Sequence, residues 1–365
     1  MTRTSTQPVV PPSPFDALRD KLSLSLPNID KARSAADATT AQLRETLNGI
    51  DLPETTALVV FGSLARREWT NDSDVDWTLL VNGPSDPEHF RLAVLIGEQI
   101  RKHFNEPGPT QTFGTLTSSH ELVHHIGGDE DTNRNLTRRI LLLLESCSVF
   151  GNSERNKVIR AVLQRYLVCG PGVPDPNDLR FSVPRFLLND VVRLWRTFAV
   201  DYAAKKWQRA DKGWALRNAK LRIPRKLTFA KGLLMCLDCE LLCDESPWTN
   251  VGTPRVGMIE EQHVNGCTEI VNLTPLDMLS RVLFAFGSTE TAKPILHAYE
   301  DYLGLLNDPA KRKHLDEAVD FQNALQDKVF SEVREISHRF GDGLQKLFFD
   351  ERDDLTALTQ KYGVF

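Results

Sequence analysis

The sequence predicts an α+β fold in which a small domain with a mixed sheet is followed by an all-helical domain. Short apolar runs typical of buried strands occur between residues 56 and 117. From Ser153 onward, almost every periodic segment has the helical spacing of apolar residues. A length of 365 residues fits about two domains, and the 41% of hydrophobic residues can bury a substantial core.

The chain is expected to divide into three parts. Residues 1–13 are rich in Pro, Ser and Thr and are expected to form a disordered tail. Residues 14–150 are expected to hold the sheet and two preceding helices, and residues 151–365 the helical domain. The start of the chain has no apolar core of signal-peptide length, and the run 140–144 is too short to cross a membrane. We therefore expect a cytoplasmic protein with no membrane partner.

In the first domain, the expected elements follow from short apolar runs and helix caps. Two helices are expected before Pro53, which interrupts the chain. Asp86 and Pro87 form a typical helix start. The expected elements, in order, are helices at 14–24 and 29–47, strands at 56–61 and 74–81, a helix at 86–104, a strand at 111–117 and a helix at 132–145.

In the second domain, Thr274 and Pro275 mark one helix start. Residues 244–272 are the least regular stretch and are expected to be a loop, and residues 341–343 (Gly-Asp-Gly) are expected to break a helix. Further helices are expected at 154–167, 184–207 and 229–242.

The six cysteines are expected to be reduced thiols. Cys236, Cys239 and Cys243 have the spacing of one helix face. No second Cys-x-x-Cys pair completes four metal ligands, so core packing is favoured over a zinc site.

The most informative segment, FGSLARREWTNDSDVDW, runs from Phe61 to Trp77. Asp74 and Asp76 are two positions apart, so on a strand their carboxylates lie on one face. Two such charges side by side are unfavourable unless a cation lies between them. Carboxylate oxygens suit Mg²⁺ or Mn²⁺, and a pair of such ions could hold both the attacking and the leaving oxygen of a phosphoryl transfer.

The residues before the acids suit an anion. Gly62 allows the backbone to approach a ligand closely. If a helix begins at Ser63, its amide groups face that ligand and the hydroxyl adds a further donor. Arg66, one turn further on, could contact phosphates or pair with a carboxylate.

These residues resemble the nucleotidyltransferase signature of the DNA polymerase β superfamily, which is a hydrophobic residue, Gly-Ser, about ten residues, and then Asp-hydrophobic-Asp. The resemblance implies transfer of a nucleoside monophosphate from ATP or another NTP to a hydroxyl, with release of pyrophosphate. It also implies that Gly62, Ser63 and Ser73 belong to the nucleotide site, and that Asp74 and Asp76 bind the catalytic metals.

The family usually has a third carboxylate on a neighbouring strand. Glu121, which follows the strand expected at 111–117, is the candidate for this catalytic role. Asp129, Glu130 and Asp131 are alternatives, although Asp131 or Thr132 could cap the next helix. Without a third acid, the protein would be a regulatory module that binds nucleotide without turnover.

The segment DTNRNLTRRILLLLESCSVFGNSE resembles one branch of this superfamily, which contains the uridylyltransferases of the PII nitrogen-signal protein. This second resemblance covers roughly residues 55–170. It favours a protein acceptor, but the substrate of that branch cannot be carried over, because the chain shows nothing like the phosphohydrolase or ligand-sensing domains of the full-length enzymes.

The segment 185–231 carries 13 Lys or Arg residues and three acids, a net charge of +10 in a chain whose net charge is −5. The whole chain is therefore not basic, but this segment could contact the triphosphate or an RNA acceptor. RNA binding by these helices alone is a third possibility for the function. Acceptors left open are a protein, tRNA or another RNA, a nucleotide and a small molecule. The cations assigned to nucleotide binding are Arg193, Arg196, Lys220, Arg225 and Lys226.

The sequence HELVH at 120–124 matches the zinc-protease pattern letter for letter. It directly follows a predicted strand, and Gly127-Gly128 would cut a helix short. Chance is therefore favoured over a zinc site.

Overall fold

The computed structural model describes residues 12–70, 72–108, 112–168, 183–208, 212–241 and 256–363. The predictions for the tail at 1–11 and for the thiols of Cys169 and Cys243 lie outside these residues.

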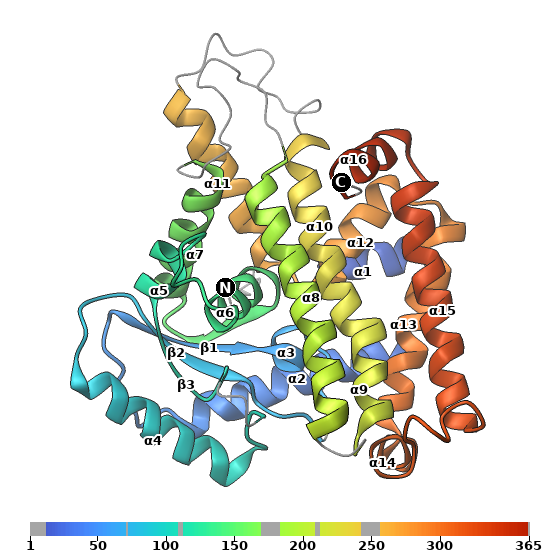
Figure 1. Ribbon diagram of the computed structural model, residues 1–365, viewed down its shortest axis with the longest axis horizontal. Helices are drawn as coiled ribbons and strands as arrows, with labels where there is room; N and C mark the ends of the chain where they lie inside the picture. The colour runs from blue at the N-terminus through green and yellow to red at the C-terminus, as the bar shows by residue number, and fades with distance from the viewer. Residues whose placement is uncertain are drawn as a thin grey trace, which may run out of the picture.

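A mixed sheet lies at the centre of the first part of the chain, as predicted, and it has four strands (Figure 1). Its strand order is β3-β2-β1-β4. Strand β1 is antiparallel to both β2 and β4, whereas β2 and β3 are parallel. The strands are β1 (Thr56–Phe61), β2 (Trp77–Val81), β3 (Thr115–Ser118) and β4 (Ser146–Phe150).

The alternation of side chains along β1 explains why the sheet is buried on both faces. Leu58 and Val60 face one hydrophobic cluster, together with Trp77 of β2 and Ile96 of helix α4 (Pro87–His103). Ala57, Val59 and Phe61 face the opposite cluster, which contains residues of helices α6 (Asn133–Leu144) and α7 (Asn152–Leu167). Helices therefore cover both faces, which fits the continuous apolar runs of β1 and β2.

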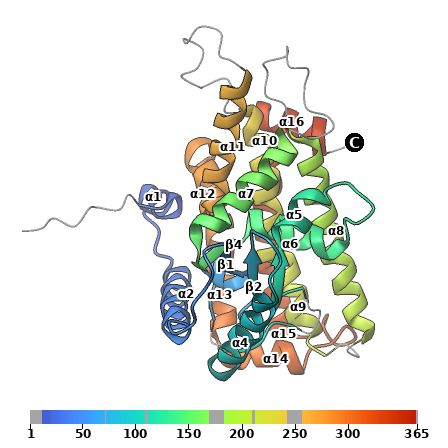
Figure 2. The same ribbon diagram turned by 90° about the vertical axis from the view of Figure 1, so that its left-hand side faces the viewer.

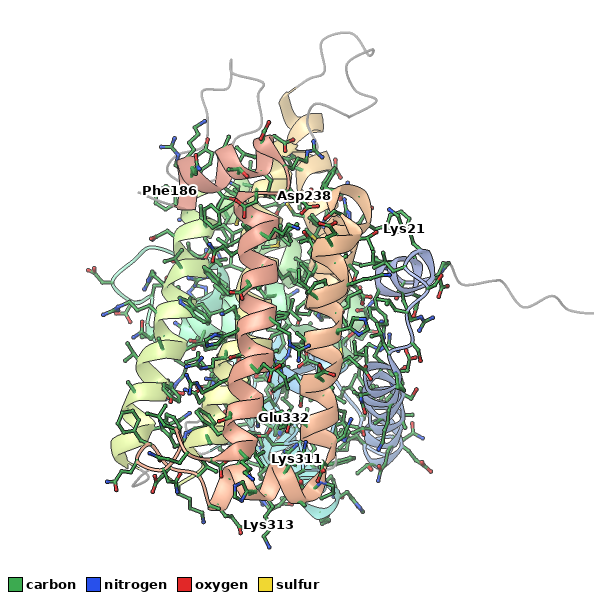
Figure 3. All side chains as sticks on the ribbon, turned by 90° about the vertical axis from the view of Figure 1, so that its right-hand side faces the viewer. Lys21, Phe186, Asp238, Lys311, Lys313 and Glu332 are labelled. Atoms are coloured by element: carbon green, nitrogen blue, oxygen red, sulfur yellow. The ribbon has the colours of Figure 1, made fainter. Side chains whose placement is uncertain are left out.

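The remainder of the described chain is helical, as predicted. Helices α13 and α15 lie side by side (Figure 1). An ion pair of 2.7 Å between Lys311 and Glu332 joins α14 to α15 (Figure 3). These helices are α8 (Arg185–Gln208), α9 (Trp214–Lys220), the π-helix η1 (Leu221–Arg225), α10 (Lys226–Leu241), α11 (Val256–Asn272), α12 (Pro275–Phe286), α13 (Thr289–Asn307), α14 (Pro309–Glu317), α15 (Lys328–Phe349) and α16 (Asp353–Gly363).

The two N-terminal helices, α1 (Pro14–Lys21) and α2 (Pro27–Thr46), pack against helices from the end of the chain (Figure 2). The carboxylate of Glu300 in α13 accepts hydrogen bonds from the backbone amides of Asn28 (2.8 Å) and Ile29 (2.9 Å). It therefore satisfies amides at the start of α2 that have no partner within the helix. One hydrophobic cluster extends from Phe15 to Tyr362, so both predicted domains share a core.

Three sequence predictions need correction. Strand β4 lies in a segment for which no strand was predicted. Helix α11 occupies residues 256–272 of the predicted loop because Val264, Cys267 and Val271 form a buried face at helical spacing. Helix α15 continues through Gly341–Gly343. A Cβ atom at Gly343 would lie 2.4 Å from Ile295 Cγ1, so this glycine allows α13 and α15 to pack closely.

None of the described helices is both long and apolar enough to cross a membrane.

Candidate active site

The residues of the signature meet at one edge of the sheet. Strand β1 ends at Phe61, and Gly62-Ser63 begins the short helix α3 (Gly62–Ala65). The antiparallel strand β2 begins at Trp77, and the amide of Phe61 donates to the carbonyl of Asp76 at 2.8 Å. The end of β1 therefore lies beside the approach to β2, which carries Asp74 and Asp76.

Gly62 meets a geometric demand of this edge. Its φ of 64° lies in the left-handed region, and a Cβ atom there would be 2.9 Å from Oδ2 of Asp76. Gly62 is therefore required both for its backbone conformation and for the close approach of this carboxylate. The hydroxyl of the neighbouring Ser63 is partly exposed and makes no hydrogen bond within the part of the chain that the structure describes.

The two aspartates lie just before β2 instead of within it. Asp74 forms an isolated bridge with Asn105, whose carbonyl accepts the amide of Val75 at 3.0 Å. Val75 is fully buried, and the aspartates on either side of it are only partly buried. Burial and, to a smaller extent, the charges of Asp74 and Glu145 raise the pKa of Asp76 to about 7, against the opposing effects of Arg66 and Lys220. These carboxylates therefore repel one another, as expected of a site that holds a cation.

Glu145 is the acid that sequence reasoning missed. It lies between α6 and β4, and the next residue, Ser146, pairs with Phe61 of β1. The buried carboxylate accepts hydrogen bonds from Arg66 Nη1 at 2.8 Å and from Thr228 Oγ1 at 2.7 Å. The signal was present in the segment LLLLESCSVFG, where an acid ends a Leu-rich helix and a five-residue strand follows.

Glu121 is not brought to this edge. It belongs to helix α5 (Ser119–His124), which follows the carboxyl end of β3. Strand β3 is parallel to β2, so this end lies at the opposite edge of the sheet from Asp76. The charge of Glu121 acts on Arg138 of α6. Among the alternatives, Asp131 pairs with buried Arg139 at 2.8 Å, and Asp129 and Glu130 are exposed.

Two predicted cations do face the carboxylates. Lys220 directly precedes η1 and Arg225 is its last residue. Because π-helical hydrogen bonds join residues five apart, both side chains lie on one side of this turn. Burial lowers the pKa of Lys220, and the charge of Asp74 opposes this effect. Burial also lowers the pKa of Arg225, which is opposed by Asp201, Glu145 and Asp76. The guanidinium of Arg225 lies 5.0 Å from the ring centre of Phe198 in α8.

Four other predicted nucleotide ligands have different surroundings. The hydroxyl of Ser73 accepts the amide of Thr70 at 3.1 Å inside the loop before Asp74. Arg193 pairs with Asp190 at 2.9 Å. Arg196 is exposed, and it lies about 200° around α8 from Phe198, the residue that faces Arg225.

The fourth of these, Lys226, interacts with Asp342 of α15. Arg193 and Lys226 therefore contact acids other than Asp74, Asp76 and Glu145, whereas Ser73 directly precedes Asp74.

Much of the remaining charge of the basic segment is used inside the fold. Lys205 pairs with Asp201 at 2.7 Å, and Arg222 donates to Asn218 at 2.7 Å. The ammonium of buried Lys231 donates to the carbonyls of Leu144 at 2.8 Å and Leu273 at 2.6 Å, so it joins the ends of α6 and α11. The high count of cations therefore does not correspond to a single exposed basic face among the described residues.

Within the described ranges, no three His, Cys, Asp or Glu side chains converge in a way that could hold a metal ion, and this holds for Asp74, Asp76 and Glu145 as well as for the other candidate ligands. The HELVH segment forms a six-residue helix in which the rings of His120 and His124 lie 4.8 Å apart. Cys236 and Cys267 are buried in the core, which agrees with the packing role predicted for Cys236.

Comparison with known families supports the resemblance of the signature. Residues 41–106 match the family model of a nucleotidyltransferase domain, and this range contains Gly62, Ser63, Asp74 and Asp76. The match supports the polymerase-β-like nucleotidyltransferase superfamily and a transferase of nucleoside monophosphates. It does not extend to Glu145, Lys220 or Arg225. No curated protein gives a significant match to the chain.

The contact between Gly62 and Asp76 predicts a loss of metal binding in Gly62→Ala. The added methyl group would displace the carboxylate of Asp76, so we expect the affinity for Mn²⁺ to fall at least about tenfold. Gly127→Ala is the matched control, because Gly127 has a similar φ of 73° with open space around its Cβ position. Titration calorimetry measures both variants, and equal affinities would contradict this role of Gly62.

The raised pKa of Asp76 predicts a pH-dependent gain of stability in Asp76→Asn. The folded, metal-free protein keeps a proton on Asp76 up to about pH 7, whereas the unfolded chain releases it near the ordinary value of 3.8. The contribution of this group to the free energy of unfolding therefore decreases as pH rises between these values. We expect the free energy of unfolding of metal-free Asp76→Asn to exceed that of the wild type by about 2 kcal/mol at pH 8 and to equal it at pH 3. Denaturant unfolding at the two pH values tests this, and a variant less stable at pH 8 would contradict it.

Proposed function

We propose that this protein is a metal-dependent nucleotidyltransferase that transfers a nucleoside monophosphate from an NTP to an acceptor hydroxyl. The observation that carries the proposal is the meeting of Gly62-Ser63, Asp74, Asp76 and Glu145 at one edge of the sheet, with Lys220 and Arg225 facing them. The family match over residues 41–106 supports the same reaction.

The donor set at this edge suits Mg²⁺ or Mn²⁺. Asp74 and Asp76 supply hard oxygen ligands. The pKa of Asp76 is raised by burial and by the charges of Asp74 and Glu145, and a divalent ion would offset these negative charges. Glu145 is the third carboxylate in this proposal, although Arg66 and Thr228 now hold it. A bound divalent ion would supply charge stabilisation for the attacking and leaving oxygens.

The remaining residues of the site bind the phosphates of the NTP. The backbone and hydroxyl of Gly62-Ser63 bind the terminal phosphates, and Lys220 and Arg225 neutralise the charge that develops on them. A bond forms between the acceptor oxygen and the α-phosphorus, and the bond from that phosphorus to the oxygen bridging it to the β-phosphate breaks. The acceptor proton passes to a carboxylate at the same edge, and pyrophosphate leaves.

The acceptor is better matched by a protein side chain, a nucleotide or a small molecule than by a long RNA. Sequence-independent RNA binding needs a row of accessible cations along the backbone path. Of the basic segment, Arg193, Lys205 and Lys231 are engaged within the fold. The resemblance of residues 55–170 to the PII-modifying branch favours a protein.

A regulatory module that binds nucleotide without turnover is the second candidate. It is favoured by the two hydrogen bonds that hold Glu145 and by the lack of three converging ligands among the described side chains. This reading predicts metal-dependent NTP binding with no transfer.

Transfer assays with matched acid variants test the proposal. The purified protein is incubated with each α-labelled NTP, Mg²⁺ or Mn²⁺, and total cell lysate. We expect label on one acceptor class with the wild type, none with Asp76→Asn, and at least about tenfold less with Glu145→Gln. Glu121→Gln is the matched control and is expected to retain wild-type activity, because Glu121 lies at the opposite edge of the sheet.

Each outcome separates the candidates. Loss of transfer in Glu121→Gln but not in Glu145→Gln would contradict our choice of the third carboxylate. Metal-dependent NTP binding without label would establish the regulatory module instead.

A further inference from the structure

Three buried side chains and the largely buried Arg66 connect the catalytic edge to the C-terminal helices. We call Glu145, Arg66, Glu68 and Tyr299 the Arg66 network. The guanidinium of Arg66 bridges two carboxylates, with Nη1 at 2.8 Å from Glu145 and Nε at 2.9 Å from Glu68. The hydroxyl of Tyr299 in α13 donates to the second oxygen of Glu68. A residue more than 230 positions along the chain from Glu68 therefore completes its hydrogen bonds.

The charged groups in this network are not fully balanced, and each donor is needed. Two carboxylates share one guanidinium, so the three charged groups sum to −1 away from water. Glu68 is 6% exposed, Glu145 7% and Tyr299 0%. A buried carboxylate is costly unless hydrogen bonds satisfy its oxygens. Glu68 relies on Arg66 for one oxygen and on Tyr299 for the other, and a missing donor cannot be replaced by bulk water.

We propose that Tyr299 is a positioning residue that holds Glu145 beside Asp76 by acting through Glu68 and Arg66. This inference rests on the proposed function. While Tyr299 satisfies Glu68, the guanidinium of Arg66 can extend to Glu145. Without the hydroxyl, Glu68 draws the guanidinium towards its unsatisfied oxygen, and Glu145 loses one of the two donors that fix its carboxylate and keeps only Thr228.

The anchor of this network is rigid. The ring of Tyr299 is packed between Phe340 of α15, at a centroid distance of 6.1 Å, and Tyr302, at 6.2 Å. Arg312 of the next helix, α14, donates to the carbonyl of Asp72 at 2.8 Å and so holds the loop that leads to Asp74. Helices α13 and α14 therefore fix the loop between the Gly-Ser and Asp-Val-Asp residues at two separate points.

Tyr299→Phe tests the inference, because it removes the hydroxyl and keeps the ring. We expect its affinity for Mn²⁺ and its kcat to fall about tenfold, with KM for the NTP unchanged because Lys220 and Arg225 are not disturbed. In the double variant Tyr299→Phe/Glu68→Gln, the unsatisfied carboxylate charge of Glu68 is removed. The guanidinium of Arg66 therefore stays hydrogen-bonded to Glu145. We expect this second change to restore most of the Mn²⁺ affinity.

Phe340→Leu is the packing control, because it loosens the contact with the Tyr299 ring and removes no hydrogen bond. We expect it to lower the thermal stability and to leave the Mn²⁺ affinity unchanged. Equal losses of affinity in Tyr299→Phe and Phe340→Leu, or no rescue by Glu68→Gln, would mean that Tyr299 only packs the core.

Nucleotide transfer and Mn²⁺ affinity, measured separately, distinguish this inference from the proposed function. A wild type that transfers nucleotide, with full activity and Mn²⁺ affinity in Tyr299→Phe, would overturn the inference alone. A wild type without transfer, in which Tyr299→Phe still weakens Mn²⁺ binding and Glu68→Gln restores it, would support the network while the proposed reaction fails.

Discussion

The repulsion between carboxylates at one edge of the sheet is the constraint on which the rest of the site depends. Asp74, Asp76 and Glu145 lie at the ends of neighbouring strands, and burial together with the charges of Asp74 and Glu145 raises the pKa of Asp76 to about 7. A fold can tolerate this only by supplying positive charge. The described chain does so with Arg66 from the Gly-Ser helix and with Lys220 and Arg225 from the π-helical turn.

This need for charge explains why the two parts of the chain share one core. The matched nucleotidyltransferase domain ends at residue 106, but Thr228 holds Glu145, and Tyr299 and Arg312 hold the loop before Asp74. A π-helical turn is uncommon, and here it brings two cations five residues apart to the same side. The helical part is therefore a component of the candidate site as well as a support for the sheet.

The local part of the site could be predicted from the sequence because its chemistry lies in one continuous segment. Gly62, Ser63, Asp74 and Asp76 follow from a strand, a turn and a second strand. Predicting the third acid required knowledge of the direction of each strand in the sheet. Glu121 follows a strand parallel to β2, which sends it to the opposite edge, whereas the short polar strand β4 returns Glu145 antiparallel to β1.

The remaining differences have the same origin in tertiary structure. A count of 13 cations could not show that Lys231 caps helix ends and that Arg193 pairs with Asp190. Similarly, Gly343 looks like a helix breaker in sequence, but it lets α15 pack against Ile295 of α13. Lys231 and Gly343 are used in contacts between helices that no local pattern specifies.

The central claim is that Asp74, Asp76 and Glu145 hold divalent ions opposite the triphosphate cations. A crystal structure of the full chain with Mn²⁺ and an NTP analogue that cannot be cleaved between the α- and β-phosphates tests it most directly. We expect anomalous density for Mn²⁺ against the carboxylates of Asp74 and Asp76, with Glu145 turned towards it and the triphosphate between Ser63 and Lys220. Manganese bound elsewhere, or a nucleotide that leaves this edge of the sheet empty, would contradict the account.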